Sequence, residues 1–123
     1  MEFDPLSKHV IGCCIEVHRV LGPGLLESAY GACLAREFHL QDTAFKKEWP
    51  LSLVYKEMKL DCGYRLDFVV EDELVIELKS VEKLLPIHEA QLLCYLKLSG
   101  KRIGLLINFN EILLRDGIKR IVL

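Results

Sequence analysis

Two carboxylates and one ammonium group interrupt the most apolar stretch of the chain, YRLDFVVEDELVIELKS, residues 64 to 80. Asp67 lies in its first half, and Glu77 and Lys79 lie two residues apart in its second half. Carboxylate oxygens are hard ligands of the kind that divalent cations such as Mg²⁺ prefer. These residue types therefore suit a divalent-cation site beside a positively charged side chain.

The polar segment Glu71-Asp72-Glu73 predicts a turn between two strands, centred on Asp72. With that turn, Asp67 faces Glu77 across the hairpin, and side chains alternate between its two faces. One face is wholly apolar and contains Leu66, Phe68, Val70, Leu74, Ile76 and Leu78. The other face contains Arg65, Asp67, Val69, Val75, Glu77 and Lys79. A shift of one residue in register would break the pairing of the two acids.

Two like charges directly opposite each other destabilise a sheet, so another interaction must compensate for Asp67 and Glu77. One explanation is a solvated outer face on which Arg65 and Lys79 form salt bridges with the acids. The other is a divalent cation bound between them. These residues alone leave both explanations open.

Two further pairs of polar residues lie at helical spacing. Glu27 and Tyr30 are three residues apart in GPGLLESAY, and Gln91 and Tyr95 are four apart in EAQLLCYLKLSG. Each pair also has a purely structural explanation: Glu27 suits the positive end of a helix dipole, and Gln91 and Tyr95 suit a hydrogen-bonded edge of the core. Their occurrence together with the acidic hairpin favours a functional site.

The apolar periodicity and the Gly and Pro positions predict the elements that hold these residues. We expect helices over residues 6–21, 25–40 and 86–98, and strands over 45–55, 59–70, 74–78, 103–109 and 118–123. This order predicts an α/β fold with a mixed central sheet, which contains an antiparallel meander and a later crossover strand and is flanked by helices. The length of 123 residues suits a single domain.

The composition is that of a globular protein, with 51% hydrophobic and 28% charged residues and a net charge of −2. No apolar run reaches the roughly 20 residues of a membrane helix, and the N-terminus does not have the pattern of a secretory signal. The cysteines include no C-x-x-C pair, and Cys13, Cys14, Cys33 and Cys94 have apolar neighbours that favour buried free thiols. We therefore expect a cytoplasmic protein with no membrane partner.

These motifs together resemble the GxxExxY protein family, a branch of the PD-(D/E)XK nuclease superfamily. The segment GLLESAY, residues 24–30, matches the motif that names the family, and Asp67 followed by Glu77-Leu78-Lys79 matches the D…ExK signature. Gln91 and Tyr95 match the QxxxY motif of RecB-like nucleases.

The similarity extends through GLLINF, residues 104–109, and DGIKR, residues 116–120, so that it covers nearly the whole chain. Leu66 stands where the superfamily motif has Pro. The resemblance implies a restriction-endonuclease-like core spanning residues 1–123 and metal-dependent hydrolysis of phosphodiester bonds in nucleic acid, with DNA favoured over RNA and RNA left open.

The resemblance also implies a role for each matching residue. Asp67, Glu77 and the backbone carbonyl of Leu78 would bind Mg²⁺ or Mn²⁺, and Glu27 would complete or extend this site. Lys79 would orient the attacking water or stabilise the transition state electrostatically.

In the same way, the resemblance implies supporting roles for three other residues. Gln91 would position Lys79 or a phosphate, and Tyr30 and Tyr95 would contact the substrate.

The alternative function is a catalytically silent module with a nuclease fold that binds nucleic acid or a protein partner. A slightly negative net charge and the lack of any recognisable element appended to the core favour this alternative. The intact set of Asp67, Glu77 and Lys79 favours the nuclease. A role in a toxin–antitoxin or defence system is a third interpretation, which the sequence does not address. A homodimer is expected because a core this small has little surface with which to grip a duplex.

Overall fold

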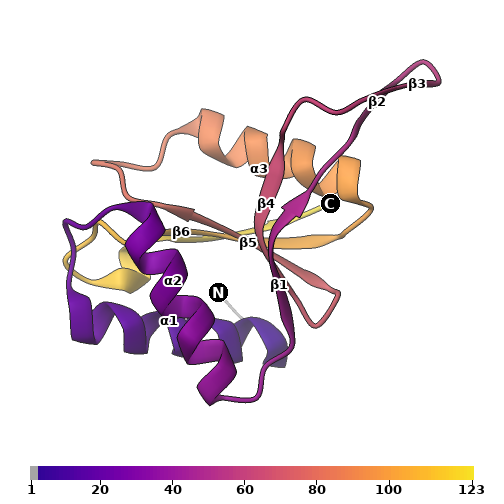
Figure 1. Cartoon of the computed structure of the whole chain (residues 1–123). Coiled ribbons are helices and arrows are strands. Elements are labelled where there is room, and N and C mark those ends of the chain that lie inside the picture. Colours follow the sequence, from indigo (N-terminus) through magenta and orange to yellow (C-terminus); the bar gives the residue numbers. More distant parts are fainter. Residues whose placement is uncertain (1–2) are drawn as a thin grey trace.

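The structure is a computed structural model that describes residues 3–123. A five-stranded sheet lies between α1 and α2 on one face and α3 on the other (Figure 1). The helices are α1 (Pro5–Leu21), α2 (Glu27–Leu40) and α3 (Pro86–Ser99), with a short 3₁₀ helix η1 (Leu114–Gly117). The strands are β1 (Phe45–Pro50), β2 (Leu53–Tyr55), β3 (Met58–Leu60), β4 (Arg65–Val70), β5 (Leu74–Lys79), β6 (Ile103–Asn108) and β7 (Ile118–Val122).

The strand order in the sheet is β1-β4-β5-β6-β7. β1, β4 and β5 form an antiparallel meander, and α3 then crosses over so that β6 lies parallel to β5. β7 closes the sheet antiparallel to β6. The predicted α/β fold with a mixed, helix-flanked sheet is therefore confirmed.

Two apolar clusters fill the two sides of the sheet. On the side of α1 and α2, buried side chains such as Val10 and Phe38 pack against Phe68 and Ile76. On the side of α3, Leu92 and its neighbours pack against the strands. Both sides of the central strands are therefore covered, as in sheets whose strands are apolar on both faces.

The residues at the ends of α1 and α3 explain where these helices begin and where α3 ends. Asp4 caps α1, because its carboxylate accepts a hydrogen bond from the backbone N–H of Ser7 at 3.0 Å. Pro86 begins α3, where its missing N–H costs nothing, and Gly100 ends it in the left-handed conformation with φ of 73°.

The two long strands predicted over residues 45–55 and 59–70 are each broken in two, which corrects the prediction. β1 ends at Pro50, and the N–H of Leu51 still bonds to the carbonyl of Tyr64 at 2.9 Å, one residue further along the β1–β4 register. Gly63, with φ of 77°, turns the chain back into β4. The outer halves, β2 and β3, pair only with each other.

The predicted faces of the hairpin also need correction. Val69 and Val75 belong to a buried cluster under α3, so the second face is not a solvated outer face. Leu66 belongs to this same cluster and not to the apolar face of Phe68, where alternation had placed it.

The five cysteines are free thiols. Cys13 and Cys14 are buried as expected and Cys33 is half-buried, but Cys94 is exposed and corrects the prediction. Among residues 3–123, no helix has both the length and the apolarity needed to cross a membrane.

Candidate active site

Strands β4 and β5 pair only near their turn, and the site lies where they separate. Val70 pairs with Leu74, and the ladder ends at Phe68 and Ile76, in the predicted register. Beyond that point the two strands are connected by hydrogen bonds to the side chains of the two acids, and no longer by ladder hydrogen bonds.

Each of these two carboxylates accepts a hydrogen bond from the main chain of the opposite strand, an arrangement that we call the interlock. The N–H of Asp67 donates to Glu77 Oε1 at 3.0 Å, and the N–H of Leu78 donates to Asp67 Oδ2 at 2.8 Å. Each carboxylate thus satisfies an amide of the other strand that would otherwise lose its partner. The acids are brought together as the sequence predicted, but through backbone contacts that the sequence did not indicate.

Burial changes the ionisation of this pair. Glu77 is only 6% exposed, and its burial, followed by the charge of Asp67, raises its pKa to about 8. Burial also raises the pKa of Asp67, against the lowering effect of the hydrogen bonds it receives. Two buried carboxyl groups in contact cannot both ionise readily, so they share a proton near neutral pH.

Lys79 is the basic residue whose charge favours ionisation of both acids. Its Nζ donates to Gln91 Oε1 at 3.4 Å, so this side chain of α3 lies beside the ammonium group of β5. Within residues 3–123, neither Lys79 nor Arg65 forms an ion pair with the two carboxylates. The structure therefore does not show the salt-bridged outer face that the sequence left open.

Glu27 reaches the site from the first residue of α2. Its exposed side chain lines a cavity of about 90 Å³, which opens beside Asp67. The other residues of this cavity are Ser28, Gly31, Lys47, Glu48, Phe68 and Leu78. No three His, Cys, Asp or Glu side chains among residues 3–123 lie close enough to hold a metal ion together.

Glu48 is the residue that the sequence did not reveal. It lies on β1 between Lys47, which pairs with Phe68, and Trp49, which pairs with Leu66, so that it faces Asp67 where the ladder is interrupted. Its φ is 54°, a conformation that side-chain-bearing residues seldom adopt within a strand. Its charge contributes to the raised pKa of Asp67. In KKEWP it resembled any exposed strand residue, so no signal could have identified it.

Tyr30 lies in the core and not on the surface. Its hydroxyl donates to the carbonyl of Gly22 at 2.6 Å and accepts from the N–H of Leu25 at 3.1 Å, and its ring stacks on Phe109 with centroids 4.5 Å apart. The side chain is fully buried, so the substrate contact that the resemblance implied is not available to it here. Instead it fixes the loop that leads to Glu27.

Tyr95 lies on α3 above the acidic pair. Its ring is 6.1 Å from the ring of Tyr64, centroid to centroid. Burial, and next the charge of Glu77, raise its pKa. Tyr95 is half-buried, so part of its ring remains available to a bound molecule.

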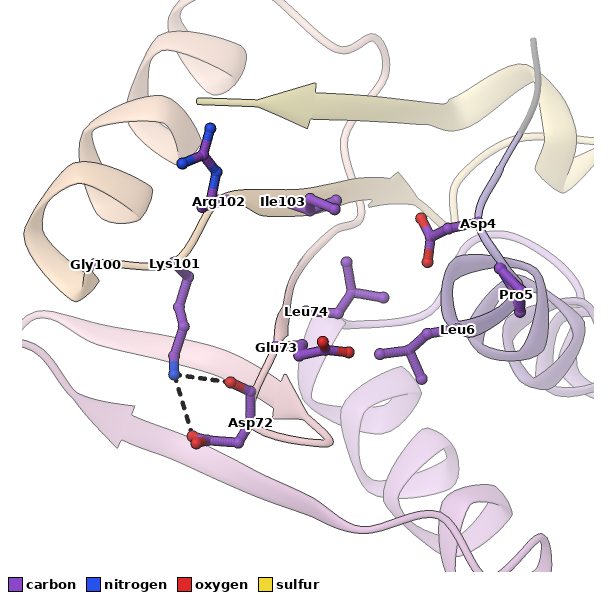
Figure 2. A pocket seen from close by; sticks show the side chains of 10 residues that line it. All are labelled: Asp4, Pro5, Leu6, Asp72, Glu73, Leu74, Gly100, Lys101, Arg102 and Ile103. Atoms are coloured by element: carbon purple, nitrogen blue, oxygen red, sulfur yellow. Dashed lines mark hydrogen bonds and ion pairs between the residues drawn. The ribbon is translucent and has the colours of Figure 1, made fainter.

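A cavity of about 650 Å³ lies at the other end of the parallel strands (Figure 2). It is lined by the first residues of β5 and β6, Leu74 and Ile103, whereas Glu77 of the acidic pair lies in the second half of β5. Its Lys101 Nζ donates to the carbonyl of Asp72 at 2.8 Å and to Asp72 Oδ1 at 3.1 Å. This cavity therefore contributes nothing to the chemistry of the acidic pair.

Comparison with known proteins gives one match. A family model described as PD-(D/E)XK nuclease superfamily matches residues 4–121, a range that contains Asp67, Glu77 and Lys79. No curated protein and no solved structure matches the chain. The match is to the superfamily, so membership of the GxxExxY branch stays a prediction.

Proposed function

Because the chain belongs to the PD-(D/E)XK nuclease superfamily, we propose that it hydrolyses phosphodiester bonds in nucleic acid, in DNA rather than RNA, with the help of Mg²⁺ or Mn²⁺. The observation that carries this proposal is the buried, interlocked pair of Asp67 and Glu77. A structural role alone does not require two mutually repelling acids in a buried position.

The residues of the pair fit a divalent cation. Their shared proton marks a place where positive charge is needed, and a cation there would replace it. Mg²⁺ keeps several of its waters and uses one or two carboxylates, so Asp67, Glu77 and the carbonyl of Leu78 suffice as ligands. Glu27, on the same cavity as Asp67, would extend the site. When bound, the cation lowers the pKa of a water molecule and neutralises charge on the phosphodiester.

The other residues act on the substrate or on one another. The Lys79 ammonium stabilises the negative charge that develops on the phosphoryl oxygens as water adds to phosphorus and an ester bond breaks. Gln91 keeps that ammonium in place by accepting its hydrogen bond. Tyr95 lines the approach to the pair.

A silent binding module is the second candidate. Each acid already has one oxygen bound to a main-chain amide, and residues 3–123 contain no cluster of three metal-binding side chains. These observations favour a protein that has kept the fold and lost turnover.

Calorimetric titration of Mn²⁺, together with a nicking assay on linear and branched DNA, tests the proposal. Wild type should bind Mn²⁺ and cut DNA, Asp67→Asn should do neither, and Asp42→Asn, which changes an exposed acid, should behave as wild type. Metal binding without cleavage of any DNA or RNA would favour the silent module. If wild type bound no metal, only membership of the superfamily would remain.

A homodimer and a cytoplasmic location remain predictions. A monomer in size-exclusion chromatography at micromolar concentration would contradict the first.

A further inference from the structure

Residues 51–64 form an arm, which leaves the sheet between β1 and β4. Its strands β2 and β3 pair with each other alone and project beyond the rest of the molecule (Figure 1). Val54, Tyr55 and Met58 on the arm are 58%, 58% and 52% exposed. An isolated two-stranded ribbon is at best marginally stable, so such an arm suits an element that has a partner.

The base of the arm is fixed beside the acidic pair. Tyr64, its last residue, contacts Tyr95 of α3 and accepts the hydrogen bond of the Leu51 N–H at 2.9 Å. Three residues after Tyr64, β4 reaches Asp67. A polymer that lies across the acidic pair on this side therefore has to run alongside the arm.

The arm carries two lysines, Lys56 and Lys59, and two acids, Glu57 and Asp61, and apolar side chains lie just behind its turn. Lys56 and Glu57 form its two-residue turn, with φ of 46° and 72°, and Tyr55 faces Met58 just behind it. Lys56 Nζ lies 5.3 Å from the centre of the Tyr55 ring. Within the described residues, neither Lys56 nor Lys59 forms an ion pair.

We propose that this arm grips a DNA duplex beside the bond to be cut, with its ribbon in a groove. The inference rests on the proposed function and adds the element that holds the substrate. A two-stranded ribbon fits the major groove of B-DNA, and free lysines neutralise phosphates. Tyr55 and Met58, just behind the turn, make apolar contacts with the base edges that the ribbon reaches.

A second copy of the chain suits the arm less well. A stable interface uses about 20–30 residues on each side. The apolar face of the ribbon offers only four side chains, Leu53, Tyr55, Met58 and Leu60.

The test measures binding of a short labelled DNA duplex by fluorescence anisotropy in EDTA, over a series of salt concentrations. The charge reversal Lys56→Glu/Lys59→Glu should lower affinity at least about tenfold at low salt. It should also reduce the slope of log affinity against log salt by about 2, because each lost phosphate contact removes roughly 0.9. The matched control is Lys8→Glu/Lys119→Glu, which makes the same charge change at exposed sites outside the arm, and its slope should equal that of wild type.

A second variant, Tyr55→Ala/Met58→Ala, separates packing from charge. It should weaken duplex binding several-fold and leave the salt slope unchanged. Both arm variants should still bind Mn²⁺ as wild type does, because they leave Asp67 and Glu77 intact; this also shows that they fold.

The outcomes distinguish the arm from the proposed function. If wild type binds and cuts DNA and the arm variants bind as well as wild type, the arm inference is overturned and the proposed function stands. If wild type binds neither metal nor DNA, both the proposed function and the arm inference are overturned. If the control variant loses as much DNA affinity as the charge-reversed arm variant does, the arm has no specific role in binding and the inference is overturned. If the arm variants lose a dimer but keep the DNA affinity of wild type, the arm binds a second copy of the chain and the inference is wrong. If wild type binds single-stranded DNA more tightly than the duplex, the placement of the arm in a duplex groove is wrong.

Discussion

Replacing Glu77 by Gln should make the metal-free protein more stable at high pH. The folded state raises the pKa of this carboxyl to about 8, because it is buried beside Asp67. Gln keeps an oxygen to accept the N–H of Asp67, and its amide can donate to the Asp67 carboxylate as a protonated Glu77 does. The variant therefore mimics the protonated side chain at every pH.

The direction in which stability changes with pH follows from the number of protons bound by the folded and the unfolded states. Between the ordinary pKa of 4.5 and about 8, folded Glu77 holds a proton that the unfolded chain releases, so stability is greatest below 4.5 and falls as pH rises through about 8. The full difference corresponds to roughly 5 kcal/mol in the free energy of unfolding. Water and strand movement near the pair relieve part of this cost, so we expect wild type to lose about 2 kcal/mol relative to Glu77→Gln.

Urea denaturation at about pH 5 and about pH 9, in the presence of EDTA, measures this difference. Glu73→Gln is the matched control, because Glu73 is an exposed acid at the tip of the same hairpin. With EDTA left out, added Mn²⁺ should restore the stability of wild type at the higher pH and leave Glu77→Gln unaffected. A wild type that loses no more stability than Glu77→Gln over this pH range would refute the shared-proton interpretation of the pair.

The other predictions concern the loop, the first helix and proton release. Tyr30→Phe should lower the free energy of unfolding by about 1–2 kcal/mol, because the hydroxyl no longer bonds to the carbonyl of Gly22; a variant as stable as wild type in urea would contradict this. Asp4→Ala should cost about 1 kcal/mol in the same assay, because α1 loses its cap on the N–H of Ser7. Mn²⁺ binding near pH 7 should release about one proton from Glu77 and its partner, so the calorimetric heat should depend on the ionisation enthalpy of the buffer. Equal heats in phosphate and Tris would exclude this.

Local sequence patterns were enough to predict the hairpin that holds the acidic pair. The apolar runs on both sides of Asp72 and a single polar break gave a register that the structure confirms from Val70 and Leu74 to Phe68 and Ile76. Strand alternation has a strict period of two, so one turn position determines every pairing that follows it.

The prediction failed where tertiary contacts override that period. Leu66 lies on the side of α3 because the ladder is interrupted at Glu48 and Asp67, and this distortion has no local signature. Glu77 lies near Tyr95 of α3, a helix that comes later in the chain, so its burial has no local signal in the sequence. β1 ends at Pro50, which has no N–H to donate, and a strand prediction based on apolar content alone does not weigh this property.

The interlock of Asp67 and Glu77 also has a consequence for how a ligand is received. Each side chain is tied by one oxygen to an amide of the opposite strand, so it has already lost most of its rotamer freedom in the folded protein. Ordering a free glutamate side chain costs about 1.5–2 kcal/mol of conformational entropy, and here folding has met that cost in advance. The same ties make the two carboxylates move together, since separating them requires β4 and β5 to part further. Binding of the proposed cation would thereby depend on the rigidity of the sheet itself.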